Sequence, residues 1–73
     1  MLKLKPLFLE QISPLAHRQD VSMTAVMNFL MTVQYNETID AALENLRSDA
    51  ASYGWNAATI KAIRAGIHLA AKV

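Results

Sequence analysis

The sequence predicts an all-α protein, a small bundle of four helices organised as helical hairpins. Its 73 residues include only two glycines and two prolines, too few for turn-dense β architecture. Apolar residues recur at helical spacing, and the apolar segments follow Ser, Thr or Asn residues, which favour helix N-termini. We expect one domain over residues 1–73 with the helix 22–34 most buried, and helices at about 13–20, 22–34, 37–52 and 56–72.

The first twelve residues fit two structures. Residues 2–5 alternate leucine and lysine as a short strand does, whereas residues 7–12 fit one or two helical turns. We expect an N-terminal extended arm or a short helix in this segment. Ser13 and Pro14 then predict a helix start, because serine caps helices and proline suits the first helical position. Proline should also push Ser13 out of the α region.

Capping residues mark the ends of the later helices. Ser22 is the predicted N-cap of the second helix, and the segment 36–38 offers caps for the third. Gly54 provides the left-handed residue that commonly ends a helix, and Asn56 is the predicted cap of the last helix. Within that helix, Gly66 is expected to allow a close approach between helices.

Charge and composition exclude several classes of protein. A net charge of +1 is too small for a protein that wraps a polyanion, so a nucleic-acid site has to be a local patch. The chain has no cysteine, and therefore no disulfide or thiolate zinc site. A core this small supplies only about 3–5 kcal/mol, so we expect a homo-oligomer such as a dimer. The longest uncharged run, residues 21–36, is shorter than the ~20 apolar residues of a membrane span; we expect a cytoplasmic protein.

Residues 15–30 resemble the helix-turn-helix of bacterial and phage DNA-binding regulators. The small and apolar positions of that family hold Ala16, Val21, Val26 and Phe29. Asp20 stands at the usual turn glycine, and aspartate tolerates the left-handed conformation of such a turn. The resemblance implies that the second helix of the motif reads DNA through its exposed polar residues, which are Ser22, Thr24 and Asn28.

The same helix also supports a different interpretation. Apolar residues cover almost all of its other directions, which is typical of a buried core helix or of a dimer seam. Methionine is adaptable at binding surfaces. In a protein-interaction module, such as an inhibitor, an antitoxin-like partner or an assembly adaptor, the partner-binding residues would be Met23, Met27, Met31 and Trp55.

Residues 49–64 repeat the helix-turn-helix pattern with a glycine at the turn. Asp49 departs from the pattern, since an apolar residue is usual there. The spacing predicts that one face of the last helix carries Lys61, Arg64, His68 and Lys72. Such a stripe could hold phosphates, an acidic protein or an anionic membrane surface. In the alternative, these cations balance the helix dipole and pair with the acidic third helix.

The N-terminal residues also resemble a second DNA-binding family. Residues 2–5, followed by helical segments, look like a ribbon-helix-helix repressor, with Lys3 and Lys5 facing DNA. Pro14 would fall inside the first helix of that motif and the chain continues well beyond it, which weakens this alternative.

No catalytic residues, metal site, cofactor or small-molecule substrate are predicted. His17 and His68 are the only histidines and the chain has no cysteine, so no metal site is expected, and no nucleophile–base pair or glycine-rich phosphate loop occurs at motif spacing. We expect a non-enzymatic regulator that binds DNA through a helix-turn-helix-like element, as a dimer. A protein-interaction module that docks through its methionine-rich surface is the alternative.

Overall fold

The computed structural model describes residues 1–72; the last residue of the expected domain, Val73, lies outside the described residues. In chain order the elements are β1 (Leu2–Leu4), α1 (Leu7–Ile12), a 3₁₀ segment (Ser13–His17), α2 (Met23–Thr32), a 3₁₀ segment (Val33–Tyr35), α3 (Ile39–Tyr53), α4 (Ala57–His68) and β2 (Ala70–Lys72). Within residues 1–72 there are thus four α-helices and one two-stranded sheet, which confirms the all-α prediction.

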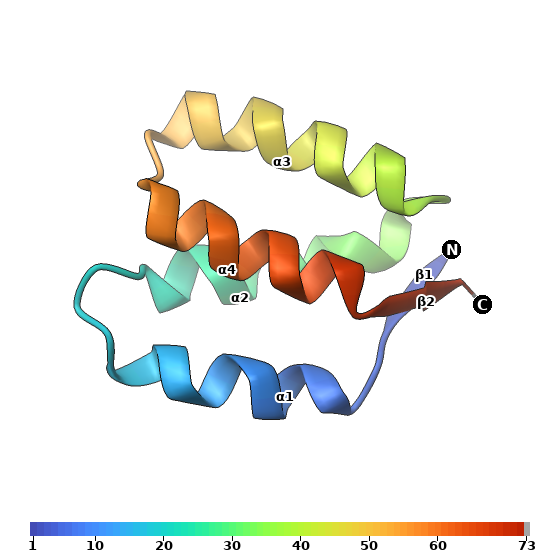
Figure 1. Ribbon diagram of the computed structural model, residues 1–73. Helices are drawn as coiled ribbons and strands as arrows, with labels where there is room; N and C mark the ends of the chain where they lie inside the picture. Colours follow the sequence, from blue (N-terminus) through green and yellow to red (C-terminus); the bar gives the residue numbers. More distant parts are fainter. Residues whose placement is uncertain (73) are drawn as a thin grey trace.

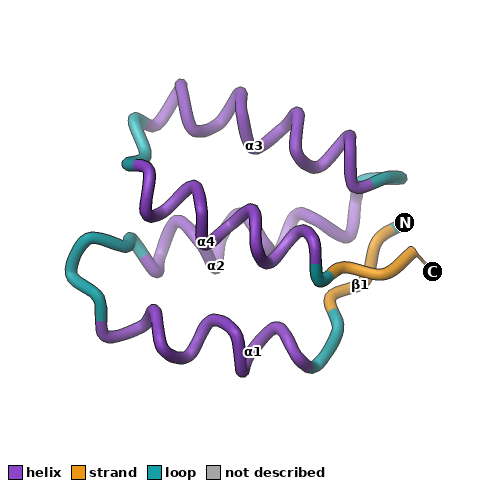
Figure 2. The backbone as a smooth tube through the Cα atoms, viewed as in Figure 1, coloured by secondary structure: helices purple, strands orange, loops and turns teal. Residues whose placement is uncertain are grey.

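Helix α4 occupies the middle of the molecule. Figure 1 shows α4 between α1 and α3, with α2 behind it, and α4 contacts all three of these helices. The strands β1 and β2 pair at one end of the bundle (Figure 2). The pairing is antiparallel, with Leu2 opposite Lys72 and Leu4 opposite Ala70.

The core is centred on α4 and not on α2. The buried residues of α4 are Thr59, Ala62, Ile63, Gly66 and Ile67, whereas those of α2 are Val26, Phe29 and Leu30. The prediction that the second helix is the most buried is therefore wrong. A helix with neighbours on three sides buries more of its circumference than one that packs from a single side. The outer side of α2 consequently leaves Met27 and Met31 exposed.

Gly66 lies where α4 meets α2 and α1. A Cβ atom built on Gly66 would lie 2.9 Å from both terminal methyl carbons of Leu30 and 3.1 Å from the ring of Phe8. Carbon atoms in favourable contact are about 3.5–4.0 Å apart. The prediction that Gly66 permits close helix packing is confirmed.

The predicted helix start at Ser13 is wrong. Helix α1 begins earlier, at Leu7, and Ser13 has helical backbone angles of φ −51° and ψ −45°. The Ser13 hydroxyl donates to the Leu9 carbonyl at 2.8 Å. Pro14 has no N–H for a bond to the preceding turn, and the chain tightens at this point into a 3₁₀ segment that ends at His17. The N-terminal residues thus form both the strand and the short helix that their pattern allows.

The last helix is shorter than predicted. It ends at His68, four residues before the predicted end at 72, and residues 70–72 form β2. Pairing with β1 gives these residues hydrogen-bond partners and buries the side chains of Leu2 and Ala70. Lys72 is consequently in a strand and does not continue the face of α4.

The other predicted caps are confirmed. The side chains of Ser22, Thr38 and Asn56 accept from the backbone N–H groups three residues later, at the starts of α2, α3 and α4. Gly54 ends α3 in the left-handed conformation, with φ 67°.

Candidate functional site

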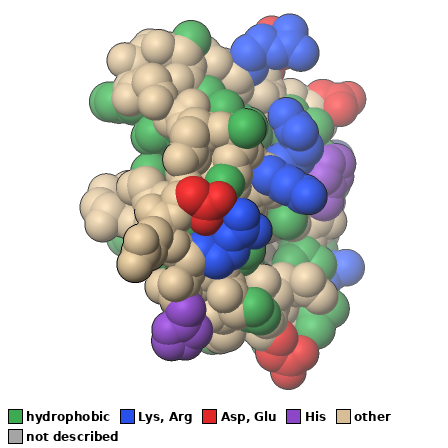
Figure 3. All heavy atoms as spheres, turned by 60° about the vertical axis from the view of Figure 1, so that its left-hand side comes forward, with side chains coloured by type: hydrophobic (Ala, Val, Ile, Leu, Met, Phe, Trp, Pro, Cys, Tyr) green, Lys and Arg blue, Asp and Glu red, His purple; other side chains and the backbone are tan. Residues whose placement is uncertain are grey.

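Basic side chains gather on the exposed side of α4. Lys61, Arg64 and His68 are all exposed and follow the predicted helical spacing. Figure 3 shows lysine and arginine side chains gathered on one side of the molecule, with a histidine beside them. Because α4 is the central helix, this stripe lies in the middle of the face that α1, α4 and α3 form together.

Arg47 of α3 joins this surface. Arg47 and Arg64 line one depression of about 390 Å³ between α3 and α4, whose other lining residues are Leu43, Leu46, Ala50 and Ile60. Sequence reasoning missed Arg47 because it counted this residue within the acidic segment. The available signal was its position one turn after Leu43, at the edge of the apolar stripe of α3. We call this surface the basic face, made of Arg47, Lys61, Arg64 and His68.

Within residues 1–72, the acids of α3 form no ion pair with the basic face. Among residues 1–72, ion pairs join the N-terminal ammonium of Met1 to Glu37 at 3.6 Å and Arg18 to Asp20 at 2.7 Å. The expected pairing of α4 cations with α3 acids is therefore wrong, because no ion pair in the described chain joins these helices. The permanent charges of Arg47, Lys61 and Arg64 consequently face solvent.

Lys72 does not belong to the basic face. It lines a separate depression of about 230 Å³ together with Glu37 and Asp40. Strand β1 pairs with β2 of the same chain, and Lys3 and Lys5 are exposed beside this small sheet.

The polar strip predicted on α2 lies in a different depression. Ser22, Thr24 and Asn28 line a groove of about 430 Å³ between α2 and the end of α3. The groove's other lining residues are Ala25, Phe29, Thr32, Asp49, Tyr53 and Trp55. No lining residue is shared with the depression of the basic face. The residues of α2 that were predicted to contact DNA thus line the same groove as Trp55, which was predicted to bind a protein partner. We call this depression the aromatic groove; Asp49 and Tyr53 are members that sequence reasoning missed.

The three predicted methionines share the flank of α2 away from the aromatic groove. Met23 is half-buried, and Met27 and Met31 are 40 % and 68 % exposed. None of the three lines the aromatic groove. The exposed Tyr35 follows one turn later, in the 3₁₀ segment. We call Met23, Met27 and Met31 the methionine stripe.

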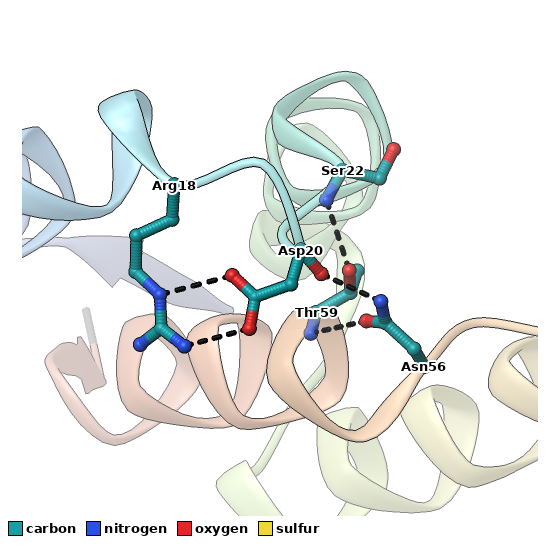
Figure 4. Close-up of polar contacts among 5 residues, drawn as sticks. All are labelled: Arg18, Asp20, Ser22, Asn56 and Thr59. Atoms are coloured by element: carbon teal, nitrogen blue, oxygen red, sulfur yellow. Dashed lines mark hydrogen bonds and ion pairs between the residues drawn. The ribbon is translucent and has the colours of Figure 1, made fainter.

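A polar latch fixes the start of α2 against the start of α4 (Figure 4). The Asn56 side chain donates to the Asp20 carbonyl at 2.6 Å and accepts from the Thr59 N–H at 2.9 Å. The Ser22 N–H donates to the hydroxyl of Thr59, which is 1 % exposed, at 2.9 Å. Within residues 1–72, Gly54 is the residue with positive φ. The expected left-handed conformation of Asp20 is therefore wrong. The hydrogen bonds of the polar latch hold this turn instead.

Asp20 also forms an ion pair within the same turn. Its carboxylate accepts from Nε and Nη2 of Arg18 at 3.0 and 2.7 Å. The hydrogen bonds that Arg18 donates to Asp20 lower the pKa of the Asp20 carboxyl, and the same bonds raise the pKa of Arg18. Ala16, which the helix-turn-helix resemblance puts at the small position of the first helix, is exposed before this turn.

Residues 1–72 contain no cluster of three His, Asp or Glu side chains arranged to hold a metal ion. None of the described helices is long and apolar enough to cross a membrane. Comparisons with family models, with curated proteins and with solved structures found no match.

Proposed function

We propose that this protein is a small non-enzymatic regulator that binds DNA through its basic face. The supporting observation is that three exposed cations on two adjacent helices, Arg47, Lys61 and Arg64, have no ion-pair partner in the described chain. Two of them border the same depression. Guanidinium groups bind phosphate oxygens through paired N–H donors, and lysine adds a point charge.

The contact is assigned to the phosphate backbone. Helix α4 lies between α1 and α3 and does not project from the molecule (Figure 1), so it meets the duplex as part of a broad face. Phosphate contacts position a protein without reading sequence. We therefore expect weak sequence preference. The unit that we assign to DNA is α3–α4, the second of the two segments that resemble a helix-turn-helix.

A dimer is part of this proposal. Each phosphate contact contributes about −0.9 to the slope of log affinity against log salt, so three cations give about −2.7 per chain and about −5.4 per dimer. The methionine stripe provides apolar surface that a second copy would cover, since Met27 and Met31 are exposed in the single chain.

The salt dependence of duplex binding tests the proposal. The affinity is measured by fluorescence anisotropy with a labelled 20-base-pair duplex between about 50 and 200 mM salt. The slope of log affinity against log salt should be about −2.7 for a monomer or about −5.4 for a dimer. The variant Lys61→Ala/Arg64→Ala should make the slope shallower by about 1.8 per chain, from two lost contacts. Lys3→Ala/Lys5→Ala removes the same charge elsewhere and should leave the slope nearly unchanged. The proposal fails if the wild type binds no duplex at low salt, or if the first variant keeps the full slope.

A second candidate, a protein-interaction module, is favoured by the exposure of the methionine stripe. Met31 is 68 % exposed, and a side chain of this kind fits irregular apolar surfaces of a partner. This candidate predicts no duplex binding at low salt. It also predicts a protein that co-elutes with the wild type, and whose co-elution is lost in Met31→Glu and kept in Gln34→Glu, a matched exposed change.

A further inference from the structure

We propose that the aromatic groove binds an arginine side chain presented by a partner protein. The inference stands apart from DNA binding, because the groove shares no residue with the basic face. Its volume of about 430 Å³ lies within the ~300–1,000 Å³ typical of ligand pockets. Two features of the groove favour this occupant, an aromatic wall and one carboxylate.

The aromatic wall is formed by Trp55 with two neighbours. Trp55 is half-buried and meets Phe29 edge to face, with ring centroids 5.9 Å apart and planes at 88°. Tyr53 stacks on Trp55, with centroids 5.5 Å apart and planes at 22°. Tyr53 is 71 % exposed, so the stack extends from the half-buried Trp55 to solvent. Faces of aromatic rings attract cations, and guanidinium is flat enough to stack on them.

Asp49 makes the groove negatively charged. It is the charged residue among those that line the groove, it is half-buried, and no ion pair in the described chain involves it. A carboxylate beside aromatic rings favours a cation that both stacks and donates hydrogen bonds. Arginine does both with one planar group, whereas lysine offers a point charge. Asn28 also lines the groove, and its side chain carries an amide oxygen that can accept a hydrogen bond.

An anion is the less suitable occupant although the groove borders the start of α2. The Ser22 hydroxyl already accepts from the Ala25 N–H, which caps this helix. The Asp49 carboxylate would repel an anion placed there. The same groove therefore selects against the phosphates that we assign to the basic face.

The experiment uses the one tryptophan of the chain as its reporter. Nα-acetyl-L-arginine N-methylamide is titrated into the protein while Trp55 fluorescence and amide NMR shifts are recorded. Its citrulline analogue, with the same shape and no charge, is the matched probe. We expect saturable binding of the arginine probe in the millimolar range, with shifts confined to α2, the end of α3 and Trp55. The citrulline probe should bind several-fold more weakly.

Variants separate the roles of charge and fold. Asp49→Asn should weaken binding of the arginine probe by about 1.5- to 5-fold, the range for a solvent-accessible ion pair. Asp40→Asn removes a carboxylate from the same helix outside the groove and should leave the affinity unchanged. Duplex binding should survive Asp49→Asn, which distinguishes failure of this proposal from failure of the DNA proposal.

Three results would overturn the inference. Equal affinity for the arginine and citrulline probes would remove the role of Asp49. Shifts centred on Glu37 and Asp40 would assign the probe to another depression. In a third experiment the protein is diluted without any probe. If Trp55 fluorescence changes on dilution of the wild type but not of Lys61→Ala/Arg64→Ala, the occupant of the groove is a second copy of this chain.

Discussion

Replacing Gly66 with alanine tests the packing at the centre of the bundle. The change should stabilise an isolated helix by about 1 kcal/mol, because glycine is a poor helix former. In the folded protein, however, the new methyl group would lie 2.9 Å from both Leu30 methyl carbons and 3.1 Å from the Phe8 ring. Leu30 is 2 % exposed and Phe8 is 5 % exposed, so both side chains would have to shift within the core. Overpacking of this kind costs about 1–3 kcal/mol, and we expect a net loss of about 1 kcal/mol.

Urea unfolding followed by far-UV circular dichroism measures this loss, and a thermal scan should show a decrease in Tm of about 4–8 °C. Two controls separate the terms. Ala65→Gly, at the adjacent exposed position, should cost about 1 kcal/mol through helix propensity alone. Gly54→Ala meets no atom within 4 Å, yet its φ of +67° should cost about 1–2 kcal/mol through backbone strain. A Gly66→Ala protein as stable as the wild type, or more stable, would refute the tight contact between α4 and Leu30.

The polar latch and the ion pair beside it give two further predictions. Asn56→Ala should lower the free energy of unfolding by about 1 kcal/mol for the lost cap and about 0.5–1.5 kcal/mol for the lost bond to Asp20; Asn56→Asp, which keeps the cap, should lose only the second part in urea unfolding. The Asp20 carboxylate should titrate by NMR below its ordinary value of 3.8. Because that pKa is lowered in the folded state, the ion pair stabilises the protein above this range and is lost as pH falls through the lowered value. Arg18→Gln should return the midpoint to the ordinary range, and an unchanged midpoint would contradict the ion pair.

Sequence reasoning succeeded where local chemistry decides the structure. The caps at Ser22 and Asn56 and the left-handed Gly54 depend on side chains that reach backbone groups only a few residues away. It failed where distant segments decide. Nothing near residues 70–72 indicates that their partner is β1, sixty-odd residues earlier, and so the last helix was expected to continue. Ser13 likewise carries a cap signal, but α1 already extends through it.

The candidate surfaces were likewise predictable where one helix forms them, and not where distant segments come together. The exposed row Lys61, Arg64 and His68 was predictable, because these residues share one face of one helix. The contribution of Arg47 was not, since it depends on which side of α3 packs beside α4. The polar residues of α2 were correctly expected to be exposed, but their neighbours are Asp49 and Tyr53 from the end of α3 and Trp55 from the turn after it. Their combination with aromatic rings is therefore a tertiary property.

Helix α3 separates the two surfaces. Arg47 and Asp49 are two positions apart, which is about 200° around an α-helix, and they line the depressions on either side of α3. The starting point of α3 is fixed by Thr38, whose hydroxyl accepts from the Ala41 N–H at 3.1 Å, and its end by Gly54. Rotation of α3 by one residue would move both charges out of their depressions together. Although the net charge is small, the molecule thus has one surface that favours anions and another that favours a cation. The register of α3 keeps these two surfaces apart.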